Sequence, residues 1–222
     1  LAEMFRHAGG PIDLYRADFE GGHTLKPLFD APLEIIFPDG LVPNVGDGYG
    51  RDIYLQDVHL YEYAHTAWRD PRHAWLLQRP SPGANPGRDL EARKVRLLWG
   101  TPPGEAQAPD VRSRVFPEHG YVILRSVEGR DYWDGKGFVA FLTFDQAGIH
   151  SHLDKLGLIL WGNGRLLAQD IESRPTEGHA FSSQVQRELN RRTLCSNTVI
   201  VDGRDQRSVP QLLELVDFES TP

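Results

Sequence analysis

The hydrophobic periodicity of this 222-residue chain changes near residue 105, and this change most constrains the fold. Before it, apolar residues recur at the three- and four-residue spacing of amphipathic helices, as in 24–37 and 60–68. After residue 110 they follow the alternating pattern of strands, as in 121–126 and 137–145. We therefore expect two domains, a helical one over 1–105 and a sheet domain over 106–222.

The helical part is expected to end its first helix, over residues 1–8, at the pair Gly9-Gly10. Pro27 suits the first turn of the next helix, whereas Pro32 is expected to kink or end it. The glycine-rich loop 43–50 lacks the lysine and the spacing of a phosphate cradle, so nucleotide binding is not expected. Helices are predicted over 1–8, 24–37, 60–68 and 89–99.

The second part has short strands in series without regularly intervening helices, which is typical of an antiparallel sandwich. Asn163-Gly164 and Asp202-Gly203 are strong hairpin-turn signals. The expected fold class is α+β. Strands are predicted over 121–126, 137–145, 156–161, 165–169, 197–201 and 212–218.

Composition excludes several classes of protein. The net charge of −7 gives no general attraction to nucleic acid. Apolar stretches are of strand length, so no membrane span is expected. The single cysteine, Cys195, rules out internal disulfides. Because the chain opens on Leu1 within a helical pattern, we expect it to be a piece of a longer protein.

The segment 149–155 carries the most chemistry. His150 and His152 alternate, so in an extended strand both imidazoles point to one face, and Asp170 can return to the same end of a sheet. Such a set suits a zinc site or an acid/base centre. The alternative is a pair of ordinary strand histidines. Asp154 either orients a histidine or caps a turn, and Lys155 either meets an anionic sugar or is a solvated charge.

Four segments in order resemble motifs of the heparinase II/III family of polysaccharide lyases: 116–126, 150–155, 162–170 and 197–203. The first hundred residues resemble the closing helices of that family. The resemblance implies the C-terminal helices of an incomplete α/α toroid followed by the first part of an antiparallel β-sandwich. It also implies cleavage of a uronate-containing glycan, a glycosaminoglycan or alginate, by β-elimination to an unsaturated uronate.

The resemblance assigns roles to individual residues. His150 matches the catalytic histidine of the sandwich, and His152 and Asp170 match two ligands of a Zn²⁺ ion. The third ligand is normally a histidine where this chain has Ser196, a poor zinc ligand. His179, or Cys195 as thiolate, would substitute if its side chain reaches the site. Substrate contacts are expected from Lys155 and Asn197, although Asn197 also suits a role in bracing the backbone.

Two other functions stay open. One is a carbohydrate-binding or scaffold fragment without turnover. Ser196 favours it, and so does the lack of any motif in 1–105 that matches the family's catalytic tyrosine or Asn-His pair. A zinc-dependent hydrolase would use His150, His152 and Asp170. The expected partners are an acidic polysaccharide or oligosaccharide and either a second copy of the chain, as a homodimer, or the missing remainder of the same protein. The family implies a periplasmic or secreted location.

Overall fold

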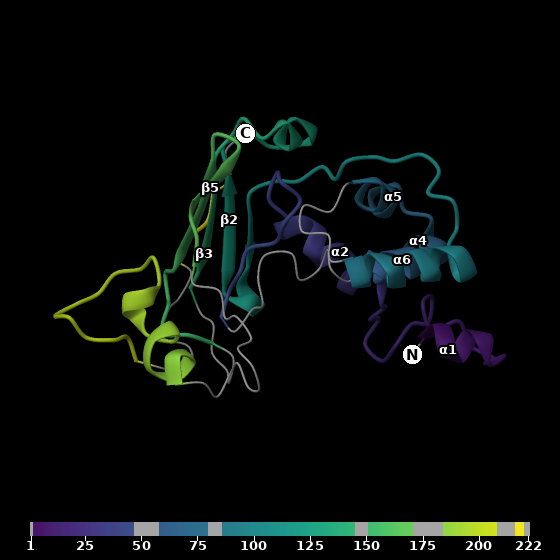
Figure 1. Cartoon of the computed structure of the whole chain (residues 1–222), viewed down its shortest axis with the longest axis horizontal. Helices are drawn as coiled ribbons and strands as arrows, with labels where there is room; N and C mark the ends of the chain where they lie inside the picture. The colour runs from purple at the N-terminus through teal and green to yellow at the C-terminus, as the bar shows by residue number, and fades with distance from the viewer. Residues whose placement is uncertain are drawn as a thin grey trace. The chain divides into compact units, whose positions relative to one another are not determined.

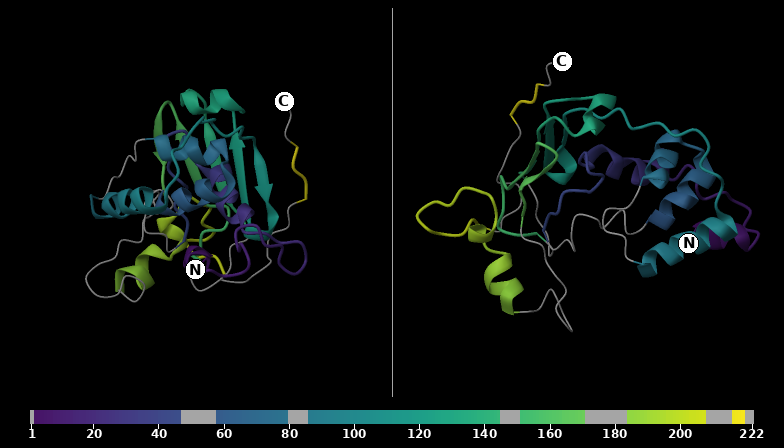
Figure 2. Two further views of the ribbon diagram at one scale, coloured as in Figure 1. Left: turned by 90° about the vertical axis from the view of Figure 1, so that its right-hand side faces the viewer. Right: turned by 45° about the horizontal axis from the view of Figure 1, so that its top comes forward.

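The computed structural model describes residues 2–46, 58–79, 86–144, 151–170, 184–207 and 216–219 (Figures 1 and 2). The described residues belong to two compact units. A helical unit comprises residues 1–36 and 54–109, and a sheet unit comprises 37–53 and 110–222. Helices together with an antiparallel sheet confirm the α+β class.

The helical unit contains helices close to those predicted from periodicity. α2 begins at Lys26 and ends at Ile35, and Pro32 lies inside it without ending it. The carbonyl of Leu28 loses its helical partner to Pro32, but Leu28 is 70% exposed, where water can replace that bond. The described helices are α1 (Ala2–His7), α2 (Lys26–Ile35), α4 (Val58–Trp68), α5 (Pro71–Gln78) and α6 (Pro86–Trp99).

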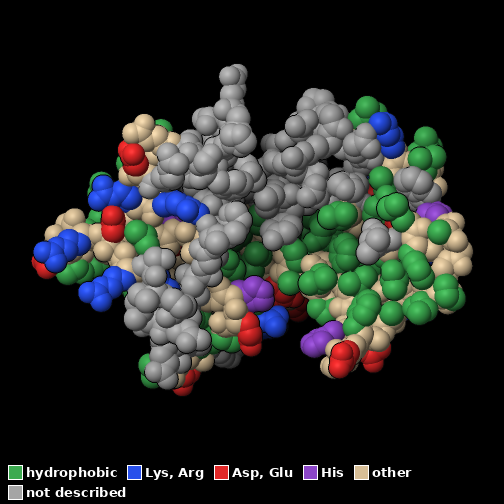
Figure 3. Space-filling view, turned by 90° about the horizontal axis from the view of Figure 1, so that it is seen from below, with side chains coloured by type: hydrophobic (Ala, Val, Ile, Leu, Met, Phe, Trp, Pro, Cys, Tyr) green, Lys and Arg blue, Asp and Glu red, His purple; other side chains and the backbone are tan. Residues whose placement is uncertain are grey.

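α5 (Pro71–Gln78) was not among the predicted helices, although its start signal is plain. Asp70 is the N-cap, its side chain accepting a hydrogen bond from the Arg72 amide, and Pro71 occupies the first helical position. Both residue types are preferred there. Hydrophobic side chains gather over this unit on the face seen in Figure 3. Its buried apolar side chains include Leu33, Tyr61, Ala64, Ala74, Leu76, Leu77 and Val95.

The sheet unit contains a five-stranded antiparallel meander in the order β1-β2-β3-β4-β5. Ile123, Phe141 and Ile159 are aligned across the three central strands, and all three are at most 3% exposed. These side chains form the core on one face, as the alternating pattern predicted. The strands are β1 (Arg114–Phe116), β2 (Tyr121–Arg125), β3 (Val139–Thr143), β4 (Leu158–Gly162) and β5 (Arg165–Ala168).

Both predicted turns have the expected backbone. Asn163 and Gly164, between β4 and β5, have φ of 51° and 74°, as a two-residue type I′ hairpin requires. Asp202 and Gly203 have φ of 54° and 64° and lie inside an isolated bridge from Val201 to Arg204.

The strand predicted over 197–201 is wrong. Asn197 and Thr198 form a bend, residues 199–200 have no regular structure, and Val201 makes only an isolated bridge; Val199 and Val201 are exposed. Side-chain bonds hold this backbone locally: Asn197 Nδ2 donates to the Gln169 carbonyl oxygen at 2.8 Å, and Thr198 Oγ1 donates to that of Lys155 at 2.6 Å. Of the last predicted strand, residues 212–215 lie outside the described residues, and 216–218 have no regular structure.

None of the helices in the described ranges has the length and apolarity that crossing a membrane requires.

Candidate metal centre

Three buried side chains meet at one end of the sheet, next to the start of β4 and the end of β5. His152, Asp154 and Asp170 each offer a ligand atom, and these atoms all lie within 4.8 Å of one another. The three residues are 4%, 2% and 8% exposed. His152 and Asp154 lie in the loop before β4, and Asp170 follows β5. Because β4 and β5 are antiparallel neighbours, the start of β4 and the end of β5 lie side by side at the same end of the sheet.

The structure thus brings together His152 and Asp170, the two predicted metal ligands, and adds Asp154. His150, the predicted catalytic residue, lies outside the described residues. Residues 151–157 are not a strand: they form a loop with a bend at Leu153 and a turn at Lys155-Leu156, so the strand geometry considered for the two imidazoles does not apply to His152. The loop, not a strand, therefore positions His152 and Asp154.

A tight turn fixes Asp154 against the end of β3. Its carbonyl oxygen accepts hydrogen bonds from Thr143 Oγ1 at 3.0 Å and from the Gly157 amide at 2.7 Å. Leu156 has φ of 62°, a left-handed conformation that leucine rarely adopts. A Cβ on Gly157 would lie 2.7 Å from the Asp154 carbonyl oxygen. The turn therefore requires glycine at 157 and holds a costly backbone conformation at 156.

The other side of the loop is bonded to residues 191–206. Thr193 is fully buried, and its Oγ1 donates to the Leu153 carbonyl oxygen at 2.7 Å. The Leu153 amide donates to the carbonyl oxygen of Arg191 at 3.0 Å. Gln206 accepts from the Lys155 amide at 2.8 Å and donates to the Lys155 carbonyl oxygen at 2.9 Å. The backbone of Lys155 is thus held in place.

Asn197 braces the same end of the sheet. Its carbonyl oxygen accepts from the Leu158 amide at 3.0 Å, and its side-chain amide donates to the carbonyl oxygen of Gln169, next to Asp170. Asn197, Asp154 and Asp170 line a cavity of about 10 Å³. A space of this size is close to that of one water molecule or one ion.

Burial and the neighbouring charges both act on the cluster. Burial raises the pKa of Asp154, and the neighbouring His152 and Lys155 oppose that rise. Two carboxylates and one imidazole form a donor set that suits Zn²⁺ and other divalent transition ions. The residues present therefore fit the metal that the resemblance implies.

The position expected for a third histidine does not supply a strong ligand. Ser196 Oγ is buried and has no hydrogen-bond partner among the described residues. Burial raises the pKa of the half-buried Cys195 thiol, which disfavours the thiolate that binds metals. His179 lies outside the described residues. Asp154 is the residue that sequence reasoning underrated, although its spacing from His152 was a usable signal.

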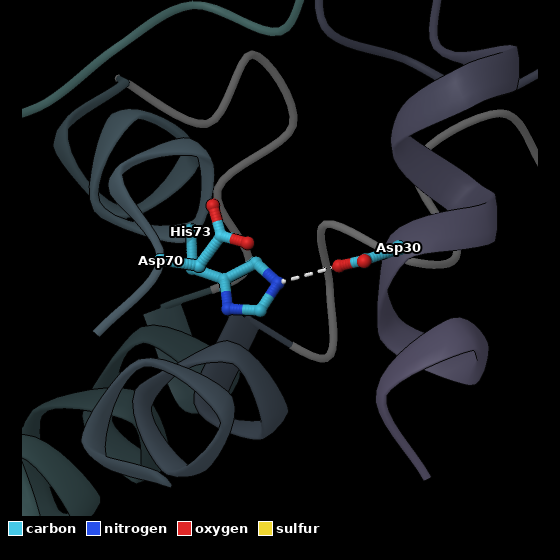
Figure 4. Close-up of side chains that lie close together, drawn as sticks. All are labelled: Asp30, Asp70 and His73. Carbon is cyan, nitrogen blue, oxygen red and sulfur yellow. Dashed lines mark hydrogen bonds and ion pairs between the residues drawn. The ribbon is translucent and has the colours of Figure 1, made fainter. Parts of the chain in front are cut away.

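A second group, Asp30, Asp70 and His73, lies in the helical unit (Figure 4). Lys26 Nζ donates to Asp30 at 2.6 Å and to Asp70 at 2.8 Å, and Arg72 donates to the same two carboxylates at 2.9 and 2.7 Å. Burial alone would raise the pKa of both aspartates, but the bonds from Lys26 and Arg72 outweigh it and lower the pKa of each. Since cations already neutralise these carboxylates, the group is a structural ion-pair network.

Comparison with known proteins identifies the sheet unit. Residues 108–216 match the family model "Heparinase II/III-like, C-terminal". No curated protein matches the chain.

Solved structures resemble the chain at low identity. Heparan sulfate lyase HepC from Pedobacter heparinus is 18% identical, with a TM-score of 0.54 over 82% of this chain and 24% of its own. A heparinase III structure is 16% identical, with a TM-score of 0.58 over 86% and 28% of the two chains. The chain spans about a quarter of the length of these proteins, and such identities establish a shared fold. The family match is therefore a property of residues 108–216, which resemble the C-terminal domain of heparinase II/III-like proteins.

Proposed function

We propose that the chain is part of a polysaccharide lyase that cleaves a uronate-containing glycan by β-elimination. The observation that carries the proposal is the convergence of His152 and Asp170 in a buried cluster, within residues that resemble the C-terminal domain of heparinase II/III-like proteins. Relatives of the same fold are named heparan sulfate lyase and heparinase III, which supports an acidic glycan as substrate.

The reaction makes definite physical demands. The C5 proton of a uronate, α to the carboxylate, is weakly acidic, so the carboxylate charge must be neutralised as the enolate-like anion develops. A base must remove that proton, and an acid must protonate the departing glycosidic oxygen. We assign neutralisation of the carboxylate, or the proton transfer, to His150, two residues before the buried His152. The ammonium of Lys155 is the proposed contact for the anionic sugar.

The metal centre would serve this site indirectly. A divalent cation such as Zn²⁺, when bound, supplies a fixed positive charge at the base of the loop. His152 and Asp170 would hold it, and the loop bonded through Thr143 and Thr193 would hold His152. The chain's own contribution is therefore a rigid loop immediately after His150. Asn197 braces Gln169 through one hydrogen of Nδ2, and the second amide hydrogen and Oδ1 are the atoms proposed to contact the substrate.

The test is the appearance of unsaturated uronate, which absorbs near about 230 nm when elimination has created a 4,5-double bond. The full-length protein is incubated with heparan sulfate, alginate, hyaluronan and chondroitin. We expect a rise in absorbance with at least one substrate, and an H150A rate at least about 100-fold lower. H119A is the matched control, because His119 lies in a short helix of the same unit and has no proposed role. No product from any of the four glycans would refute the proposal.

A second candidate is glycan binding without turnover. Ser196, at the position of the expected third metal ligand, favours it. Calorimetric titration with the same glycans separates the two functions, because this candidate requires binding and no unsaturated product.

The location follows from the proposed substrate. A lyase acting on extracellular polysaccharide must meet it outside the cytoplasm, so we propose a periplasmic or secreted protein. Cell fractionation that recovers the full-length protein in the cytoplasm alone would contradict this assignment.

A further inference from the structure

We propose that Asp154 is the third protein ligand of a divalent cation held by His152 and Asp170. One imidazole and two carboxylates would then replace the expected set, in which a second histidine stands where this chain has Ser196. The inference rests on the metal centre of the proposed function, and it names the ligand that the resemblance left open.

The distances favour a three-ligand site. Tetrahedral zinc with bonds of about 2.0–2.1 Å places neighbouring ligand atoms about 3.3 Å apart. The ligand atoms of His152, Asp154 and Asp170 already lie within 4.8 Å of one another, so small side-chain rotations close the remaining gap. The cavity of about 10 Å³ lies against both carboxylate residues and has room for one ion.

The backbone holds Asp154 in this place. Its carbonyl oxygen is fixed by Thr143 Oγ1 and by the Gly157 amide, and the turn includes the left-handed Leu156. Such a conformation persists where the surroundings determine it, and it is common beside functional groups. The loop therefore presents the Asp154 side chain without any rearrangement of the backbone.

Charge distinguishes this cluster from the one in the helical unit. Asp30 and Asp70 are each bonded by Lys26 and Arg72. Asp154 is only 2% exposed, and the charges that act on it are those of its loop neighbours His152 and Lys155. A buried carboxylate needs a compensating positive charge, and a divalent ion between Asp154 and Asp170 supplies it. Ser196, a neutral hydroxyl, cannot.

The test measures Zn²⁺ affinity of the protein by competition with a chromophoric chelator. We expect D154N to bind Zn²⁺ at least about 100-fold more weakly than the parent, since even supporting residues of metal sites are worth 10- to 100-fold. S196A is the matched control and should bind within threefold of the parent. In EDTA, D154N should melt no lower than the parent, because asparagine keeps the shape of the side chain and removes a buried charge.

X-ray absorption of the zinc-loaded parent gives a readout that needs no variant. The expected first shell has one imidazole and otherwise oxygen ligands. Two imidazoles, D154N affinity within threefold of the parent, equal losses in D154N and S196A, or no Zn²⁺ binding by the parent would each overturn the assignment. Zinc binding that depends on Asp154 without unsaturated product from any glycan would refute the lyase proposal and leave this one standing.

Discussion

The ion-pair network of the helical unit allows a quantitative prediction through the substitution D70N. Asp70 Oδ1 accepts hydrogen bonds from the Arg72 amide and Nε, at 2.9 and 3.0 Å. Its Oδ2 accepts from Lys26 Nζ and Arg72 Nη2, at 2.8 and 2.7 Å. Asparagine caps a helix as well as aspartate, so D70N keeps the bond to the Arg72 amide and loses the charge.

The magnitude follows from the exposure of the partners. Asp70 is 11% exposed in its side chain, whereas Lys26 and Arg72 are 33% and 29% exposed and regain water when the pairs are lost. Charge-assisted bonds contribute about 1.5–3 kcal/mol when well buried, and exposed pairs contribute about 0.2–1 kcal/mol. Because Lys26 and Arg72 are about a third exposed, we place each pair near the top of the exposed range, at about 0.75–1 kcal/mol, and expect D70N to lower the free energy of unfolding by about 1.5–2 kcal/mol at pH 7.

The pH dependence gives this prediction a second readout. The folded-state pKa of Asp70 lies below its ordinary value of 3.8, so the stabilisation is complete above the unfolded-state pKa. It is lost as the pH falls below about 4 and the carboxylate becomes protonated. The difference between parent and D70N should therefore shrink steadily from pH 4 downward.

Urea unfolding followed by far-ultraviolet circular dichroism measures both effects. D134N is the control, because Asp134 and its partner Lys136 are 61% and 83% exposed and should contribute less than about 0.5 kcal/mol. A D70N deficit below about 0.5 kcal/mol at pH 7, or one that persists unchanged near pH 2, would refute the role assigned to this network.

Three further substitutions test the sheet unit by urea unfolding. F141A removes a fully buried ring between Ile123 and Ile159 and should cost about 3–5 kcal/mol; a loss below 1 kcal/mol would contradict the core assignment. G157A places a Cβ 2.7 Å from the Asp154 carbonyl oxygen, so we expect a loss of about 1–3 kcal/mol and weaker Zn²⁺ binding, and unchanged zinc affinity would count against the turn. T193V removes the donor to Leu153 and should cost about 1–3 kcal/mol, whereas a neutral result would show that this bond does not hold the loop.

Local signals predicted local structure well. Asn163-Gly164 forms the predicted turn because both residues tolerate positive φ, and the strands beside it follow the alternating pattern. Asp70-Pro71 is an equally local signal, because it provides both the N-cap and the first residue of α5. β1, with only three residues, offers too short a pattern to be recognised, and it exists because β2 pairs with it.

The failed strand at 197–201 shows where local pattern misleads. Val199, Ile200 and Val201 have high strand propensity, but a strand needs a partner with open backbone groups. Side-chain bonds from Asn197 and Thr198 tie this backbone to residues 169 and 155 instead. Propensity cannot anticipate that competition, because the acceptors lie about 30 to 40 residues away in the chain.

The amino-acid pattern alone determined the α+β class and the sheet register around Asn163-Gly164. It also gave the hypothesis that His152 and Asp170 act together. Each of these follows from spacing or turn chemistry within a few dozen residues. Only the tertiary structure decided that Asp154 joins these two residues and that Asn197 braces the backbone. The reason is physical: whether a carboxylate ends in solvent or in a buried cluster depends on the turn through Leu156 and Gly157 and on its bonds to β3.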